Sequence, residues 1–162
     1  MAIAWIGLGA NLGAAQATVS AAIAALGQLE GCTLLRASSL YATPAWGNTA
    51  QPPFVNAVAK LQTSLAPLPL LQALLALERT FGRVRLPGEH WGPRALDLDL
   101  LLYDQQVLAL PGLDVPHPYL HERAFVLVPL AELEPDLQIP GHGRVQDAVM
   151  RVDTCGITLL GG

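Results

Sequence analysis

Charged residues are scarce in this sequence of 162 residues, and lysine is almost absent. Charged residues make up 14% of the chain and hydrophobic residues 52%, the single lysine is Lys60, and the net charge is −4. A broad basic surface for nucleic acid or an anionic membrane is therefore not expected. The balance is typical of a globular protein with a substantial core. We expect one domain over residues 1–162.

Cysteines and long hydrophobic runs are also sparse. Cys32 and Cys155 stand alone without a C-x-x-C spacing, which excludes the usual zinc and redox motifs and fits a reducing compartment. The apolar N-terminal stretch lacks the basic residues of a signal peptide and is interrupted by Asn11, Gln16 and Ser20. No run reaches the ~18 uninterrupted apolar residues of a membrane span. We expect a cytoplasmic protein with no membrane partner and no nucleic-acid partner.

The glycine motifs of common nucleotide-binding folds are missing. The segment Gly7-Leu8-Gly9-Ala10-Asn11-Leu12-Gly13 approaches G-x-G-x-x-G, but leucine stands at the third glycine position. The acidic residue that should end the next strand is missing, and no G-x-x-x-x-G-K-[ST] sequence occurs. A Rossmann-type dehydrogenase is therefore a weak alternative, and the ordinary interpretation is a tight turn between a strand and a helix.

Hydrophobic periodicity predicts an alternation of strands and helices. Strands are predicted over residues 3–9, 33–41 and 54–63 and again up to Asp104, and helices over 14–29 and 67–81. The order β-α-β-β-α-β predicts an α+β, ferredoxin-like sandwich, with both helices packed on an antiparallel sheet.

C-terminal additions complete the predicted fold. Gln105-Gln106 is a candidate hairpin turn, and Val115-Pro116-His117-Pro118 a rigid loop. The apolar residues 124–133 predict a short helix interrupted at Pro129, and residues 145–151 a last helical segment.

The most informative stretch is the strand that ends at Asp104. Its alternation places Leu96, Leu98, Leu100 and Leu102 on a core face and Asp97, Asp99, Leu101 and Tyr103 on the opposite face. Two carboxylates one strand repeat apart lie about 6–7 Å from each other between Cα atoms. Because like charges repel, a divalent cation such as Mg²⁺ would explain their pairing. The ordinary alternative is the wet face of a half-exposed sheet.

Arginine is concentrated just before this strand. Four of the eight arginines fall within sixteen residues: Arg79, Arg83, Arg85 and Arg94. The planar guanidinium group suits phosphate oxygens. Carboxylates for a metal and arginines for phosphate in one segment indicate phosphoryl-type chemistry, although any one of these arginines alone would more simply be a solvated surface residue.

Residues 91–101 read W-G-P-R-A-L-D-L-D-L-L. This stretch resembles the defining motif of the 6-hydroxymethyl-7,8-dihydropterin pyrophosphokinases (2-amino-4-hydroxy-6-hydroxymethyldihydropteridine diphosphokinases) of folate biosynthesis, and the resemblance extends over almost the whole chain. It implies the ferredoxin-like fold and the transfer of pyrophosphate from ATP to the hydroxymethyl group of the pterin, which gives AMP and the pterin diphosphate. It also implies Mg²⁺ (two ions), ATP as co-substrate, small-molecule partners only, and a monomer.

The resemblance assigns roles to individual residues. Asp97 and Asp99 would bind the metal. Arg83, Arg85 and Arg94 would contact the triphosphate and act in catalysis, and His117 and Arg123 of the V-P-H…R segment would line the nucleotide site. The pterin would be held by seven residues: Phe54 and Phe125 as a sandwich, Asn56 as its hydrogen-bonding partner, and Thr43, Pro44, Trp46 and Trp91 around it.

Two positions depart from the family pattern: Leu86 stands where close relatives carry lysine, and Pro118 where others carry tyrosine. A non-catalytic ferredoxin-like module that binds a nucleotide or RNA remains an alternative. The acidic net charge and the lack of an aromatic RNA-binding strand argue against it.

Overall fold

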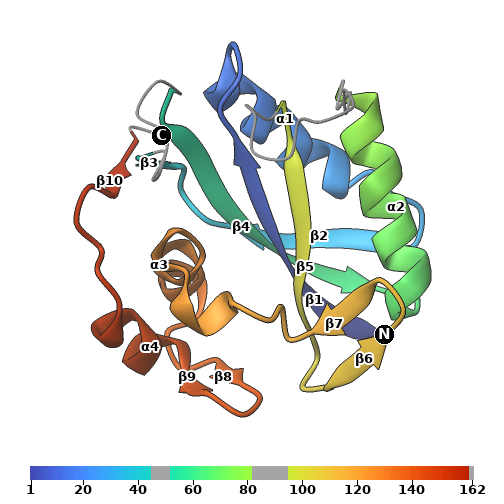
Figure 1. The fold of residues 1–162 in the computed structure, drawn as a ribbon. Helices are drawn as coiled ribbons and strands as arrows, with labels where there is room; N and C mark the ends of the chain where they lie inside the picture. Colours follow the sequence, from blue (N-terminus) through green and yellow to red (C-terminus); the bar gives the residue numbers. More distant parts are fainter. Residues whose placement is uncertain (45–51, 82–94, 161–162) are drawn as a thin grey trace.

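A computed structural model describes residues 1–44, 52–81 and 95–160 (Figure 1). Five predicted site residues lie outside these ranges: Trp46, Arg83, Arg85, Trp91 and Arg94. The main elements are β1 (Ala2–Ala10), α1 (Ala15–Leu26), β2 (Cys32–Ala37), β3 (Tyr41–Thr43), β4 (Phe54–Thr63), α2 (Pro67–Thr80) and β5 (Asp97–Tyr103). The C-terminal part adds β6 (Leu108–Leu110), β7 (Leu113–Val115), η1 (Leu120–Glu122), α3 (Ala124–Leu133), β8 (Gln138–Ile139), β9 (Gly143–Arg144), α4 (Val145–Arg151) and β10 (Thr158–Leu159).

The central sheet has the antiparallel ferredoxin-like arrangement that the sequence predicts. Its order is β10-β3-β4-β1-β5, and β2 pairs with the other half of β4. The predicted strand over 33–41 is wrong in one respect, because it is broken into β2 and β3. At the break, the amide of Val58 donates to the Ser38 hydroxyl at 2.9 Å, so a side chain replaces a main-chain acceptor there.

Both faces of the sheet are buried. Ile6 and Leu8 of β1 pack with α1 and α2 in one core. Trp5 of β1 and Val58 of β4 point the other way and pack in a second core with the C-terminal helices α3 and α4. Figure 1 shows α1 and α2 on a different side of the sheet from α3 and α4. Burial on both faces explains why the strands read as nearly continuous apolar runs.

Strand β5 contains a bulge that breaks the predicted alternation. Ile6 pairs with Leu100 and Trp5 with Leu102, so Leu101 is an extra residue. Leu101 and Leu102 therefore both join the core under α3. Tyr103 turns to the other core, where its hydroxyl donates to the carbonyl of Leu65 at 2.7 Å. The predicted faces of Leu102 and Tyr103 are wrong for this reason.

Two details of the C-terminal additions also differ from prediction. The hairpin β6–β7 turns at Pro111-Gly112, where Gly112 has φ +77°, and not at Gln105-Gln106. Helix α3 runs through Pro129 without interruption, because its largely buried apolar side chains outweigh the single lost backbone hydrogen bond. None of the helices in the three described ranges is long and apolar enough to cross a membrane.

Candidate active site

The floor of the candidate site is formed by glycine residues of β1. Every second residue of β1 faces α3, and these residues are Ile3, Trp5, Gly7 and Gly9. Because the last two are glycines, the end of the strand has no side chain on this face. A Cβ atom at Gly9 would lie 2.8 Å from Nδ2 of Asn56. The missing side chains leave bare backbone where a ligand can approach closely.

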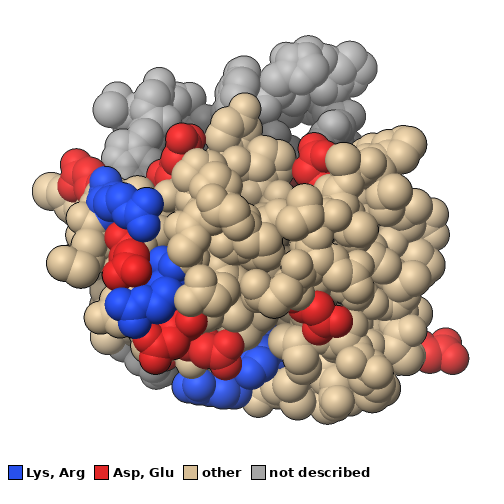
Figure 2. Space-filling model, turned by 90° about the horizontal axis from the view of Figure 1, so that it is seen from below, with Lys and Arg blue, Asp and Glu red and all other residues tan. Residues whose placement is uncertain are grey.

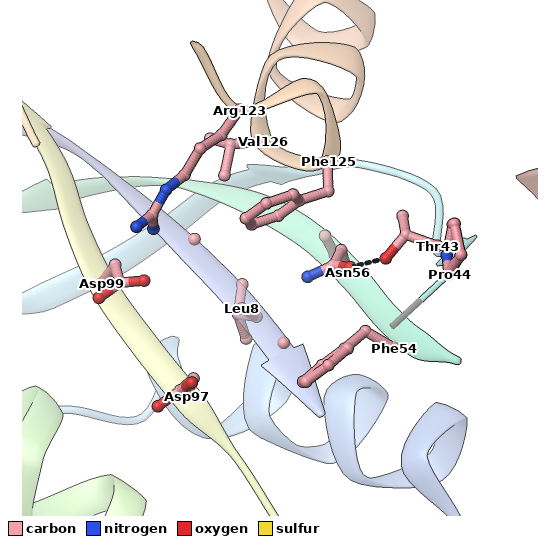
Figure 3. Close-up of a pocket in the computed structure, with 13 residues that line it drawn as sticks. Leu8, Thr43, Pro44, Phe54, Asn56, Asp97, Asp99, Arg123, Phe125 and Val126 are labelled. Atoms are coloured by element: carbon pink, nitrogen blue, oxygen red, sulfur yellow. Dashed lines mark hydrogen bonds between the residues drawn. The ribbon is translucent and has the colours of Figure 1, made fainter. Parts of the chain in front are cut away.

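A pocket of about 320 Å³ lies on this floor (Figure 3). It brings together eight of the predicted site residues: Thr43, Pro44, Phe54, Asn56, Asp97, Asp99, Arg123 and Phe125. The backbone register explains the assembly, because Gly9 pairs with Asn56 of β4 on one side and with Asp97 of β5 on the other. With strands about 4.8 Å apart, Asn56 and Asp97 lie about 10 Å apart across the floor.

One end of the pocket carries an oriented amide. Asn56 is buried, and its Oδ1 accepts a hydrogen bond from the hydroxyl of Thr43 at 2.8 Å. With its oxygen bound to this hydroxyl, the amide presents its nitrogen on the other side. The nitrogen of Asn56 therefore points into the pocket, as Figure 3 shows.

Two aromatic rings flank this amide from different elements. Phe54 comes from the start of β4 and Phe125 from the first turn of α3. The two rings extend into the pocket from opposite sides of Asn56 (Figure 3). Flat apolar faces on both sides of a hydrogen-bonding amide suit a planar heterocycle.

The other end of the pocket is acidic. Asp97 and Asp99 lie side by side on β5, half-buried, and both line the pocket. No cluster of three or more His, Cys, Asp or Glu suited to a metal occurs among the described residues. Two carboxylates do not make a closed zinc site, but they fit Mg²⁺, which fills its remaining positions with water and substrate phosphate oxygens.

Arg123 provides a positive charge above the pocket. It precedes α3, and its guanidinium lies 5.7 Å from the ring centroid of Phe125 and 5.6 Å from that of Tyr119. In Figure 3 the guanidinium points toward β5, on the side of Asp99. It therefore stands between the aromatic and acidic parts of the pocket.

His117 lies in a neighbouring pocket of about 270 Å³, and Asp99 lines both pockets. Burial, and then the charge of Arg123, lower the pKa of His117 to about 4, although Asp114 acts in the opposite direction. The imidazole is therefore neutral near pH 7. The amide of Tyr119 donates to Nδ1 at 3.4 Å, which leaves the proton on Nε2. His117 can offer a hydrogen-bond donor without a charge.

Sequence reasoning missed a buried acid beside the aspartates. Glu78 of α2 is 2% exposed, and its Oε1 accepts a hydrogen bond from the amide of Leu98, between the two aspartates, at 2.8 Å. The available signal was a lone glutamate in the apolar stretch 67–81. The sequence marks Gly7 and Gly9 as part of a turn motif, but their role as the pocket floor follows only from the face of β1 on which they lie.

The sequence of this chain matches a known family. Residues 5–135 match the family described as 7,8-dihydro-6-hydroxymethylpterin-pyrophosphokinase (HPPK). The chain belongs to this family. A relative from Pseudomonas aeruginosa, named 2-amino-4-hydroxy-6-hydroxymethyldihydropteridine pyrophosphokinase, is 45% identical over 158 residues, which cover 98% of this chain and 96% of the relative. A relative of the same name from Methylorubrum extorquens is 41% identical over 157 residues, covering 97% and 98%.

Solved structures agree on the fold. A crystal structure of HPPK-DHPS in complex with substrates superposes with a TM-score of 0.72 at 12% identity, covering 93% of this chain and 43% of that chain. At this identity the likeness supports the fold alone, and it confirms the ferredoxin-like prediction. This chain spans less than half the length of that protein.

Family membership confirms the predicted class of enzyme, a pterin pyrophosphokinase of folate biosynthesis with ATP as co-substrate. The dehydrogenase and the RNA-binding module are not favoured. On the face seen in Figure 2, Lys and Arg side chains alternate with Asp and Glu. That face of the described residues therefore offers no continuous basic surface for nucleic acid.

Proposed function

We propose that this pocket transfers the terminal diphosphate of ATP to the hydroxymethyl group of 6-hydroxymethyl-7,8-dihydropterin. The observation that carries the proposal is the row Asn56–Gly9–Asp97 across three strands. It places a group that can recognise a heterocycle about 10 Å from carboxylates that can hold a metal and phosphates. A fused two-ring pterin with a hydroxymethyl arm can span that distance.

The pterin ring would stack between Phe54 and Phe125, with its hydrogen-bonding edge toward Asn56. Stacking on two faces orients the ring plane, and the fixed amide selects one direction within that plane. Gly9 would lie below the ring, where its lack of a side chain permits contact with the backbone. The hydroxymethyl arm would then point toward Asp97 and Asp99.

In the reaction, the hydroxymethyl oxygen attacks the β-phosphorus of ATP, the bond from that phosphorus to the α,β-bridging oxygen breaks, and AMP leaves. The hydroxyl proton is released to solvent. Catalysis of such a transfer is mostly positioning and electrostatic stabilisation. Arg123 would contribute positive charge from above, and His117 a neutral donor from the neighbouring pocket. Arg83, Arg85 and Arg94 keep their predicted role at the triphosphate, in a segment outside the described residues.

Asp97 and Asp99 would hold Mg²⁺, and we propose two ions. Bound there, the metal would neutralise phosphate oxygens and acidify the attacking hydroxyl. The aspartates fit this role because they are half-buried neighbours, and a cation relieves their repulsion. Glu78, bonded to the amide between them, would hold β5 in place. We expect the protein to act as a monomer in the cytoplasm.

Product analysis tests this function. The purified protein is mixed with ATP, Mg²⁺ and the reduced pterin, and the nucleotides are separated by chromatography. Equal amounts of AMP and pterin diphosphate are expected, and omission of the pterin should prevent AMP formation. Formation of ADP with a pterin monophosphate would contradict the proposal.

A further inference from the structure

Glu132 of α3 accepts hydrogen bonds from three donors, two on Ser39 in the break between β2 and β3 and one on Tyr41 at the start of β3. Its carboxylate accepts from the amide of Ser39 at 3.0 and 3.1 Å, from the hydroxyl of Ser39 at 3.1 Å, and from the hydroxyl of Tyr41 at 2.6 Å. Burial and the neighbouring carboxylate raise the pKa of Tyr41 to about 12, so this hydroxyl stays a donor at all ordinary pH values. Hydrogen bonds to an ionised carboxylate are stronger than those between neutral groups.

The positions of these residues connect this cluster to the pocket. Phe125 and Glu132 are seven residues apart on α3, so they lie on one face of the helix, about 10 Å apart along its axis. Tyr41 and Thr43 are two residues apart on β3 and share one face of that strand. This face of α3 and this face of β3 therefore lie opposite each other at two places. At the first, Glu132 contacts Tyr41 directly. At the second, Phe125 faces the Thr43–Asn56 pair across the pocket.

We propose that Glu132 is a positioning residue for the pterin pocket: by holding α3 to the break between β2 and β3, it sets the separation between Phe125 and the Thr43–Asn56 wall. This inference rests on the proposed function. All three donors to Glu132 come from the β2–β3 segment, which leads to the Thr43–Asn56 wall and not to the aspartates of β5. Loss of Glu132 should therefore weaken pterin binding and leave nucleotide binding nearly unchanged.

A second anchor on the same helix end provides a matched control. Glu134 forms an ion pair with Lys60 of β4 at 3.1 Å, and this pair reaches neither β3 nor the pocket. Glu134→Gln removes a carboxylate two residues away from Glu132 and tests what a general loosening of the helix end does.

Calorimetric titrations of the full chain with 6-hydroxymethylpterin and, separately, with a non-hydrolysable ATP analogue and Mg²⁺ test the role. For Glu132→Ala we expect the pterin Kd to rise roughly tenfold or more, the cost of a displaced positioning group, with the ATP-analogue Kd changed less than about twofold. Tyr41→Phe should raise the pterin Kd by a smaller factor. In the Glu132→Ala, Tyr41→Phe double variant, the loss of pterin binding free energy should be smaller than the sum of the losses in the two single variants. Glu134→Gln should leave the pterin Kd unchanged.

Ultraviolet titration of tyrosine checks the contact itself, because Glu132→Gln should bring the Tyr41 pKa down from about 12. An unchanged pterin Kd in folded Glu132→Ala overturns the proposal, as does an equal loss of pterin and nucleotide binding. If Glu132→Ala does not fold, the pterin Kd values of Tyr41→Phe and Ser39→Ala test the role in the same assay, and unchanged values in both overturn it. A wild-type protein that does not bind the pterin even with the ATP analogue and Mg²⁺ present would overturn the proposed function, whereas normal pterin binding by Glu132→Ala overturns this role alone.

Discussion

The hydroxyl of Thr43 donates to Oδ1 of Asn56 at 2.8 Å, and the amide nitrogen faces the pocket. The two residues lie diagonally on neighbouring strands, since Thr43 pairs with Phe54 and Asn56 with Tyr41. The bond holds the buried amide in place, with its hydrogen-bond donor toward the ligand. Recognition of the heterocycle depends on this pair.

Thr43→Val keeps the shape of the side chain and removes the donor. We expect pterin affinity to fall by about 1–3 kcal/mol, the cost of leaving a buried acceptor unpaired and the amide unfixed. Thr43→Ser is the control, because it keeps the hydroxyl and should bind the pterin nearly as well as the wild type. Equal affinity for the valine and serine variants in calorimetry would contradict this role.

Gly9→Ala should damage the same end of the pocket from below. The new Cβ would lie 2.8 Å from Nδ2 of Asn56, closer than such contacts allow, so the amide must move. We expect the KM for the pterin to rise roughly tenfold, equivalent to about 1.4 kcal/mol, with a smaller change in the KM for ATP. In an Asn56→Ala background, Gly9→Ala should change the KM for the pterin little further. A further tenfold rise there would show that Gly9 acts through another contact.

Asp97→Asn and Asp99→Asn should each lower kcat by at least about 10²-fold, in the range for losing one preorganised electrostatic group. Folding should not suffer, because removing one of two adjacent negative charges relieves repulsion. Steady-state kinetics at saturating Mg²⁺ and thermal melting measure the two effects. Near-normal turnover in either variant would remove that aspartate from the metal site, and a chelator should abolish wild-type activity in the same assay.

His117 makes folding stability depend on pH in a defined window. Its pKa is about 4 in the folded protein and about 6.5 in the unfolded chain, so between these values only the unfolded chain takes up the proton. The contribution of His117 to the free energy of unfolding is therefore complete above pH 6.5 and is lost as the pH falls toward 4. His117→Asn should show a shallower decline over pH 6.5 to 4 in urea unfolding, and a constant difference from the wild type between pH 7 and 8. If the unfolding free energies of the wild type and of His117→Asn fall in parallel between pH 6.5 and 4, this role of His117 is contradicted.

Much of this architecture could be read from local patterns. The period of the apolar residues and the alternation around Asp97 and Asp99 are properties of neighbouring residues. They therefore predicted the order of strands and helices along the chain and placed the aspartates on one face. The aromatic and amide residues of the pterin site were found through the resemblance of the chain to a family. The structure brings Phe54, Asn56 and Phe125 into one pocket.

What escaped prediction depends on long-range pairing. The bulge at Leu101 is visible only in the register between β1 and β5, and it alone decides which core receives Tyr103. The bonds from Ser39 to Glu132 join residues 93 positions apart, and no local pattern marks such a pair. Gly9 could have been found, since the alternation of β1 already placed it on the face opposite Leu8.

A crystal structure of the protein with 6-hydroxymethylpterin, a non-hydrolysable ATP analogue and Mn²⁺ in place of Mg²⁺ tests the central claim most directly. We predict the pterin ring between Phe54 and Phe125, its edge hydrogen-bonded to Asn56, and anomalous difference peaks for Mn²⁺ against the carboxylates of Asp97 and Asp99. A pterin bound outside this pocket, or a metal peak that touches neither aspartate, would contradict the account.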